Sequence, residues 1–243
     1  MNDIPPWVDA PFVLPVEAVT PERIGTIDLY LPRQADPAPV VVFVCGGPIP
    51  AELEWNRPRD WPVYRGYGAL LASLGVAAAP VQLPLHVYAD FPRAADALAQ
   101  AVDTLRADPR IDGDRVGIWF FCGGGPLISD WLREAPEWLR CLGVTYPVLG
   151  SRPGKELLPR FEPAQALAEA GELPPIVLTT VGKEDPLIYA TETRFAEVAR
   201  ELGRDVELIH VPNGTHGFDF ADHTEESRQA VRQAVNSVVT AMK

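Results

Sequence analysis

Short apolar runs alternate along this chain with segments that have the residue spacing of amphipathic helices. The run from Val40 to Cys45 is continuous, which is typical of a strand covered on both faces of a sheet. Strands separated by helices of these lengths predict an α/β fold, with a mostly parallel sheet and helices on both faces. The predicted strands are 26–32, 40–45, 75–82, 116–121, 141–146, 175–181 and 206–211, and the predicted helices are 65–74, 93–106, 126–133, 189–202 and 225–242.

The length of 243 residues suits one α/β domain, because no change of composition marks a linker in the middle of the chain. We therefore expect a single domain over 1–243. Residues 1–20 are rich in proline and are expected to form an extension over the surface. Residues 150–173 make the one long excursion between predicted strands. They are the candidate for a small lid and are too short for a large cap domain.

The formal net charge of −12 argues against binding to nucleic acid or to an anionic membrane surface. The N-terminal residues lack the features of a signal peptide, and no apolar run is long enough to cross a bilayer. The three cysteines have spacings that match neither a disulfide framework nor a zinc motif. We therefore expect a cytoplasmic protein, a monomer or homodimer, that uses no metal and no cofactor.

The apolar run 116–121 ends abruptly at Cys122, which Gly123, Gly124, Gly125 and then a predicted helix follow. A sharp turn from strand to helix holds one side chain in a strained, exposed position, and small neighbours let the surrounding backbone approach. The side chain presented here is a thiol, which can attack a carbonyl group and form a thioester. Cys122 is therefore the candidate nucleophile.

A thiol nucleophile needs a base, and the base needs an acceptor that orients it. His216 lies in a glycine-flanked loop directly after the last predicted strand and is the candidate base. The loop after the preceding strand carries both Glu184 and Asp185, and we favour Asp185 because it lies one residue further into the loop. These residues all follow strands, and ligands of parallel sheets bind at the carboxyl ends of the strands.

Backbone N–H groups must stabilise the negative oxygen that forms during acyl transfer. The N–H of Gly123 is one candidate, and the N–H of Gly46 or Gly47, in the turn after the run 40–45, is the other. Pro48 has no N–H group and cannot serve. Aromatic residues near these turns are the candidates for substrate binding, although aromatic residues so close to a core more often pack in it: Trp55, Trp61, Tyr64, Phe121 and Tyr146.

These residues resemble the pattern of the α/β-hydrolase superfamily, in particular dienelactone hydrolase-like proteins that use a Cys-Asp-His triad. The resemblance covers roughly 24–242 and includes Arg115-Val-Gly-Ile before the turn, Gly182-Lys-Glu-Asp185, and His216-Gly-Phe218. It implies an α/β-hydrolase fold without a large cap domain. It also implies the roles of nucleophile, acid and base for the three residues proposed above.

Three departures from the family pattern change the expected substrate. Phe120 stands two residues before the nucleophile, where the family has glycine, so either its side chain must point away from the turn or the following helix must shift. Cys45 stands where dienelactone hydrolases have a glutamate that contacts the resting thiol, which raises the question of a Cys45–Cys122 disulfide. No arginine follows His216, where those enzymes clamp a carboxylate. Dienelactone itself is therefore not the expected substrate.

Three hypotheses for function follow. The first is a hydrolase of an ester, lactone or thioester that processes a small-molecule acyl substrate through a thioester at Cys122. The second keeps this acyl-enzyme but passes the acyl group to another acceptor, as an acyltransferase or cyclase does. The third is a non-catalytic, ligand-binding protein of the same fold, which Phe120 and the missing serine suggest.

Overall fold

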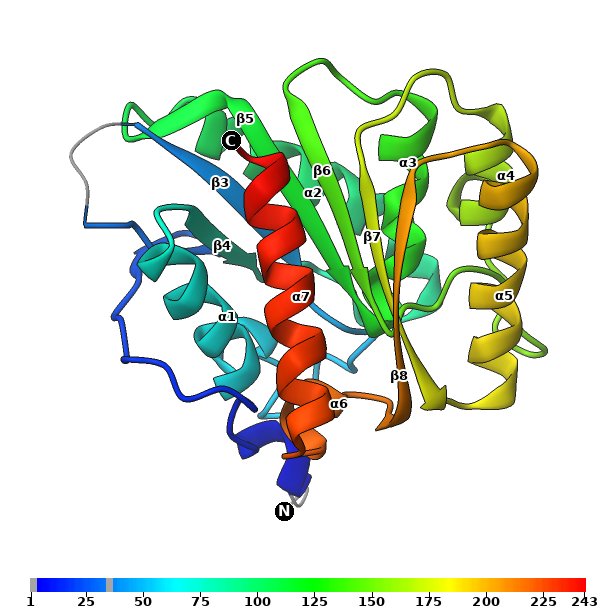
Figure 1. Cartoon of the computed structure of the whole chain (residues 1–243), viewed down its shortest axis with the longest axis horizontal. Helices are drawn as coiled ribbons and strands as arrows, with labels where there is room; N and C mark the ends of the chain where they lie inside the picture. The colour runs from blue at the N-terminus through cyan, green and yellow to red at the C-terminus, as the bar shows by residue number, and fades with distance from the viewer. Residues whose placement is uncertain (1–3, 34–36) are drawn as a thin grey trace.

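The computed structural model describes residues 4–33 and 37–243 and has the predicted α/β architecture. Its strands form one eight-stranded sheet, β1 (Glu22–Ile24), β2 (Ile27–Leu29), β3 (Ala38–Val44), β4 (Ala77–Val81), β5 (Ile111–Phe121), β6 (Leu139–Thr145), β7 (Ile176–Lys183) and β8 (Val206–Thr215). The order across the sheet is β1-β2-β4-β3-β5-β6-β7-β8 (Figure 1). The strands from β4 to β8 in this order are parallel, whereas β1 and β2 are antiparallel to their neighbours.

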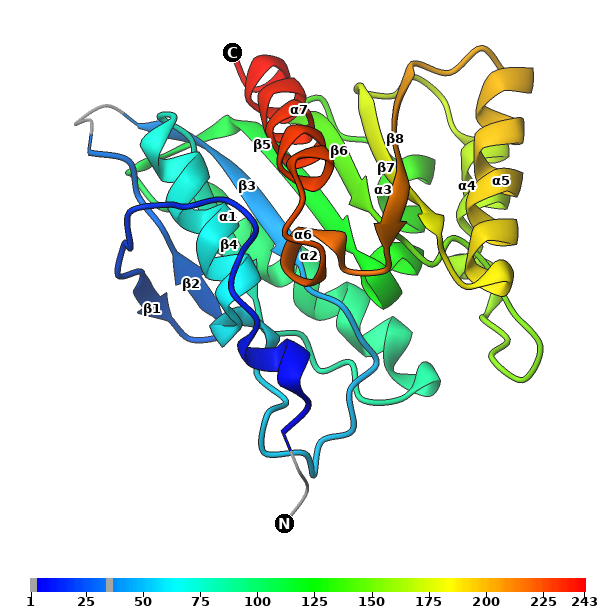
Figure 2. The same cartoon turned by 60° about the horizontal axis from the view of Figure 1, so that its bottom comes forward.

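Helices cover both faces of this sheet (Figures 1 and 2). The α-helices are α1 (Pro62–Ser73), α2 (Phe91–Arg106), α3 (Ile128–Arg133), α4 (Pro163–Glu169), α5 (Pro186–Glu201), α6 (Phe218–Ala221) and α7 (Glu225–Ala241). The 3-10 helices are η1 (Pro6–Asp9), η2 (Pro58–Asp60), η3 (Tyr88–Asp90), η4 (Cys122–Leu127) and η5 (Pro159–Phe161). Helices α1 and α7 pack on one face of the sheet, and α2, α3, α4 and α5 pack on the other.

Most predicted strands match the observed ones within a few residues, but β1 lies outside every predicted range. Strand β5 begins at Ile111, five residues earlier than the prediction, and its register against β3 shifts between Ile111 and Val116. Strand β8 continues to Thr215, so that His216 follows its last residue directly. Because β5, β6, β7 and β8 are parallel, the carboxyl ends of β5, β7 and β8 lie at the same edge of the sheet.

Successive side chains of a strand point to opposite faces of the sheet, so the last two residues of β5, Phe120 and Phe121, lie on different faces. Phe120 belongs to the apolar cluster under α2 and α3, and Phe121 belongs to the cluster under α1 and α7. Phe120 therefore points to the sheet face opposite the α1–α7 cluster, as a bulky residue at this position requires. Phe121, predicted to bind substrate, is instead fully buried in the core.

The N-terminal extension is docked on the domain, and its apolar side chains are part of the core. Phe12 and Val13 are buried in the cluster under α1 and α7, and the Val13 N–H donates to the Asp219 carbonyl at 2.8 Å. A β-carbon on Gly66 of α1 would overlap the Phe12 ring, so glycine is required where the segment crosses this helix. Figure 2 shows the N-terminal segment running across α1.

The excursion 150–173 folds into η5 and α4, and α4 packs against α3 and α5. Its buried side chains, Phe161, Ala166 and Leu167, belong to the cluster under α2 and α3. It therefore completes one layer of helices. Within the described parts of the chain, no helix is long and apolar enough to cross a bilayer.

Candidate active site

The turn after β5 has the sharp geometry that the sequence predicts. Cys122 has a φ of 49°, in the left-handed region that strains a residue with a side chain, and η4 begins there at once. A β-carbon on Gly123 would overlap the Gly47 carbonyl oxygen, and one on Gly124 would lie 2.8 Å from the Cys45 carbonyl oxygen. Glycine at these positions therefore lets the turn pack against the backbone that follows β3.

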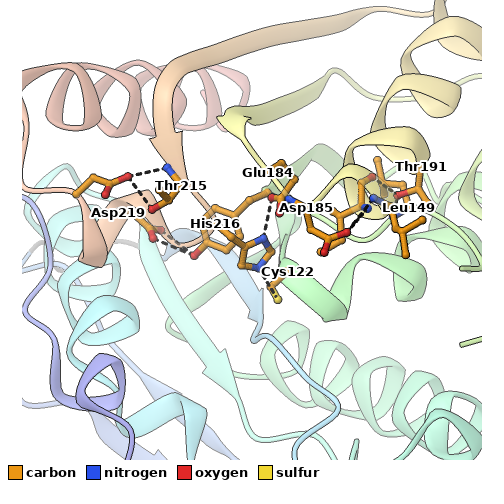
Figure 3. Close-up of polar contacts among 12 residues, drawn as sticks. Cys122, Leu149, Glu184, Asp185, Thr191, Thr215, His216 and Asp219 are labelled. Carbon is orange, nitrogen blue, oxygen red and sulfur yellow. Dashed lines mark hydrogen bonds and ion pairs between the residues drawn. The ribbon is translucent and has the colours of Figure 1, made fainter.

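Two hydrogen bonds connect Cys122, His216 and Glu184 (Figure 3). The Cys122 Sγ lies 2.9 Å from Nε2 of His216, and Nδ1 of His216 lies 2.7 Å from Oε2 of Glu184. The Glu184 side chain is 1% exposed, whereas that of His216 is 32% exposed. A thiol, an imidazole and a buried carboxylate are thus arranged in the order that nucleophilic catalysis requires.

The acid in this arrangement is Glu184, and the preference for Asp185 is corrected. The Asp185 carboxylate accepts hydrogen bonds from the N–H groups of Leu187, at 2.8 Å, and Ile188, at 3.4 Å. It is the N-cap of α5, and its side chain is exposed. The N–H groups at the start of α5 bind the Asp185 carboxylate, whereas the carboxylate of Glu184 contacts the imidazole of His216. Figure 3 shows the two carboxylates pointing in different directions.

The charges of the thiol and the imidazole depend on each other. Burial alone raises the pKa of the Cys122 thiol, but the charge and hydrogen bond of His216 and the N–H of Gly123 outweigh burial and lower it. Burial alone lowers the pKa of His216, but Cys122 and Glu184 outweigh burial and raise it above the ordinary value. This environment favours an ion pair of thiolate and imidazolium.

We expect iodoacetamide to alkylate Cys122 much faster than the other two cysteines in the folded protein near neutral pH. Cys45 and Cys141 are buried, and burial raises the pKa of both thiols, to about 12 for Cys141. Peptide mass spectrometry after a short exposure measures this selectivity. A pH profile of the alkylation rate that follows an unperturbed thiol would contradict the ion pair.

A buried network supports the imidazole from another side. The Tyr146 ring lies 4.9 Å from the His216 ring, between ring centres, and its hydroxyl donates to Asp219 at 2.9 Å. The Tyr67 hydroxyl donates to the same carboxylate at 3.0 Å. Burial raises the pKa of Asp219 to about 7, although the two tyrosine hydrogen bonds lower it. Nothing in the sequence pattern pointed to this network, because Tyr67 and Asp219 lie 152 residues apart.

Glu192 of α5 is a further buried carboxyl group, close enough to Glu184 and His216 to interact with their charges. It is 1% exposed, and neither of its oxygens has a hydrogen-bond partner among the described residues. Burial raises its pKa to about 8, the charge of Glu184 adds to this effect, and His216 opposes it. Folding therefore favours the protonated form of this group.

We expect Glu192→Gln to stabilise the fold at alkaline pH. The pKa of Glu192 is about 8 in the folded protein and near 4.5 otherwise, so ionisation costs the wild type stability as pH rises through this window. The amide cannot ionise, so the gain in melting temperature should grow from acid to alkaline pH. Glu197→Gln, at an exposed position of the same helix, is the control and should show no such trend. A constant difference at all pH values would contradict a protonated Glu192.

A cavity of about 530 Å³ opens beside Cys122 and His216, and its walls are aromatic. The Trp7 ring of η1 packs edge-on against Trp55 and Trp61, with ring centres 5.3 and 5.0 Å away. Among the described residues that line the cavity, none is a lysine, arginine, aspartate or glutamate. The aromatic lining residues are Trp7, Trp55, Trp61, Tyr64, Tyr146 and Phe220.

The structure therefore brings Trp55, Trp61 and Tyr146 to the cavity, as the sequence predicts, but not Phe121. No lining residue belongs to the excursion 150–173, so the predicted lid is not a wall of this cavity. Instead, the N-terminal extension contributes Trp7, which the sequence analysis missed. Phe220 was also missed, although it stands four residues after the candidate base.

The three N–H groups that the sequence offers as donors near the nucleophile differ in their surroundings. The Gly46 N–H donates to the Tyr64 hydroxyl at 2.9 Å, so it is already paired. The Gly123 N–H lies against the Cys122 sulfur and helps to lower the pKa of that thiol. Gly47 lines the cavity, and its N–H has no acceptor within the described residues. The expected role of Gly46 as a free donor is thus corrected.

No group of three or more histidine, cysteine, aspartate or glutamate side chains in residues 4–33 and 37–243 could hold a metal ion. The three cysteines are free thiols.

The sequence model of the Dienelactone hydrolase family matches residues 84–243 of this chain. No curated protein matches the chain in sequence. Several solved structures are similar in fold. An acetyl ester-xyloside bifunctional hydrolase from Caldicellulosiruptor lactoaceticus has a TM-score of 0.68 at 16% identity, covering 96% of this chain and 96% of that chain.

The butyrate-bound esterase Est2 from Thermogutta terrifontis has a TM-score of 0.67 at 19% identity, covering 93% of this chain and 94% of that chain. An acylaminoacyl peptidase from Pyrococcus horikoshii has a TM-score of 0.64 at 17% identity, covering 90% of this chain and 40% of that chain. At such low identity these similarities concern the fold, which is that of the α/β-hydrolases.

Proposed function

Because the chain belongs to the dienelactone hydrolase family and is a carboxylic ester hydrolase, we propose that it cleaves esters through a cysteine nucleophile. Cys122 is the nucleophile, His216 the base and acid, and Glu184 the carboxylate that orients the imidazole. The observation that carries this proposal is the 2.9 Å contact between the Cys122 sulfur and Nε2 of His216 at a strained turn.

The reaction follows from the positions of these groups. The Cys122 thiolate adds to the ester carbonyl, and the tetrahedral intermediate collapses to a thioester as the alkoxide takes a proton from His216. The neutral imidazole then removes a proton from a water molecule, whose oxygen attacks the thioester. Collapse of the second intermediate releases the carboxylic acid and returns the proton to the Cys122–His216 pair.

The apolar, aromatic cavity indicates the class of ester. The described lining of the cavity holds no lysine or arginine to clamp a substrate carboxylate, and its positive imidazolium is paired with the Cys122 thiolate, whereas aromatic side chains suit an uncharged acyl or alcohol group. We propose neutral esters, with activated thioesters and lactones as further substrates of the same acyl-enzyme. Cys45 and the absence of an arginine after His216 agree with the exclusion of dienelactone.

Product analysis tests this proposal against the two other hypotheses. A panel of neutral aryl esters, thioesters and lactones is incubated with the protein, with and without an added alcohol. Release of free acid that matches substrate consumption supports a hydrolase. A transferred or cyclised product without free acid would instead identify an acyltransferase or cyclase, and saturable binding without turnover of any panel member would identify a binding protein.

A further inference from the structure

We propose that the Tyr64 hydroxyl is a catalytic hydrogen-bond donor, which stabilises the negative oxygen of the tetrahedral intermediate on Cys122 in place of the Gly46 N–H. This inference rests on the proposed function, because such an oxygen forms only if Cys122 attacks a carbonyl group. It assigns to a side chain of α1 a role that the sequence pattern predicts for a backbone group after β3.

The position of the Tyr64 hydroxyl is the first argument. The Gly46 N–H donates to it at 2.9 Å, and Tyr64 lines the same cavity as Cys122 and His216. A β-carbon on Gly46 would lie 3.6 Å from the Cys122 Sγ and 3.7 Å from the Tyr64 Oη. The sulfur and the hydroxyl therefore border the same small space beside the Gly46 α-carbon, where glycine leaves room.

The bonding capacity of the hydroxyl is the second argument. A phenol has one hydrogen to donate and lone pairs with which to accept. The Gly46 N–H uses a lone pair, and no described residue accepts the hydrogen of Tyr64. Accepting a hydrogen bond polarises an O–H group and makes it a better donor. Burial raises the pKa of Tyr64 well above its ordinary value, so the hydroxyl keeps its proton.

The rigidity of the ring is the third argument, because a donor stabilises a transition state most when it is already in place. The Tyr64 ring stacks on Trp61, with ring centres 6.1 Å apart, and meets the Phe121 ring edge-on at 5.2 Å. Tyr64 lies in the first turn of α1 and is buried. Phe121, which the sequence analysis placed in the substrate pocket, thus contributes by holding Tyr64.

The Gly123 N–H is then the first donor, and Tyr64 is the second. The alternative second donor is the Gly47 N–H, because Gly47 lines the cavity and its N–H has no acceptor among the described residues. Substitution can tell these two alternatives apart, because the Tyr64 hydroxyl belongs to a side chain that can be replaced, whereas the Gly47 N–H belongs to the backbone.

The test compares two reactions of the same thiol in Tyr64→Phe. Acylation by a neutral aryl ester passes through a negative oxygen, whereas alkylation by iodoacetamide displaces iodide from a saturated carbon and forms no such oxygen. Rapid mixing and intact-protein mass spectrometry give both rates. Tyr30→Phe, which removes another buried tyrosine hydroxyl outside the cavity, is the matched control.

We expect Tyr64→Phe to slow acylation by about 10²- to 10³-fold, as for the loss of one oxyanion donor, and to leave alkylation within twofold. Tyr30→Phe should change neither rate. Acylation of Tyr64→Phe at the wild-type rate would overturn the inference in favour of Gly47. An equal fall in the acylation and alkylation rates would also overturn it, because it would show that Tyr64 affects only the reactivity of the thiol or the fold. A wild-type protein that is never acylated at Cys122 would instead defeat the proposed function, and this inference with it.

Discussion

Replacement of Cys122 by alanine is expected to lower kcat/KM for an activated neutral ester by about 10⁴-fold or more. The substitution removes the atom that forms the thioester and leaves the cavity walls in place. Initial rates of ester cleavage, with protein concentration corrected by the folded fraction, measure the loss. The residual rate should reflect only the remaining donors and the binding of substrate.

Cys141→Ala is the control for this substitution, because Cys141 is a buried free thiol of β6 that does not line the cavity. It should retain the wild-type rate per folded molecule. Retention of activity in Cys122→Ala would mean that the ester is cleaved without a covalent step at this residue.

Glu184→Gln is expected to lower kcat by about 10²- to 10⁴-fold, whereas Asp185→Ala should leave kcat nearly unchanged. Glutamine keeps the shape of Glu184 but cannot carry the charge that stabilises the imidazolium of His216. Asp185→Ala instead removes the N-cap of α5 and should cost about 1 kcal/mol in the free energy of unfolding.

The two substitutions should therefore have opposite effects in two measurements, steady-state kinetics and thermal or denaturant unfolding. We expect the kinetic defect at Glu184 and the stability defect at Asp185. A large fall of kcat in Asp185→Ala, with normal turnover in Glu184→Gln, would return the role of the acid to the residue that the sequence favoured.

The general fold and the positions of Cys122 and His216 were predictable, because they depend on the local pattern of apolar runs and the residues that follow them. Apolar runs predict strands, and residues directly after strands of a parallel sheet meet at one edge. The pattern therefore puts Cys122 and His216 at one edge, where the structure has them 2.9 Å apart. It does not decide between Glu184 and Asp185, because that choice depends on which side chain caps α5.

The cavity was less predictable, because its walls come from distant parts of the chain. Trp7 reaches the site only because the N-terminal segment docks across α1, and no local pattern encodes that docking. Period-two alternation puts Phe120 and Phe121 on opposite faces, but which face holds the cavity depends on the helices that cover it. The bond between Tyr64 and Gly46 likewise joins a helix to the turn after β3.

The most direct test of the account is detection of the acyl-enzyme during turnover. Wild type and Cys122→Ala are mixed with an activated neutral ester, quenched in acid within the first turnovers, and analysed by intact-protein mass spectrometry and peptide mapping. We expect the wild type to gain the mass of one acyl group in place of a hydrogen, located on Cys122, and to lose it at the rate of turnover. Cleavage of the ester with no adduct, or with the same adduct in Cys122→Ala, would contradict a cysteine nucleophile.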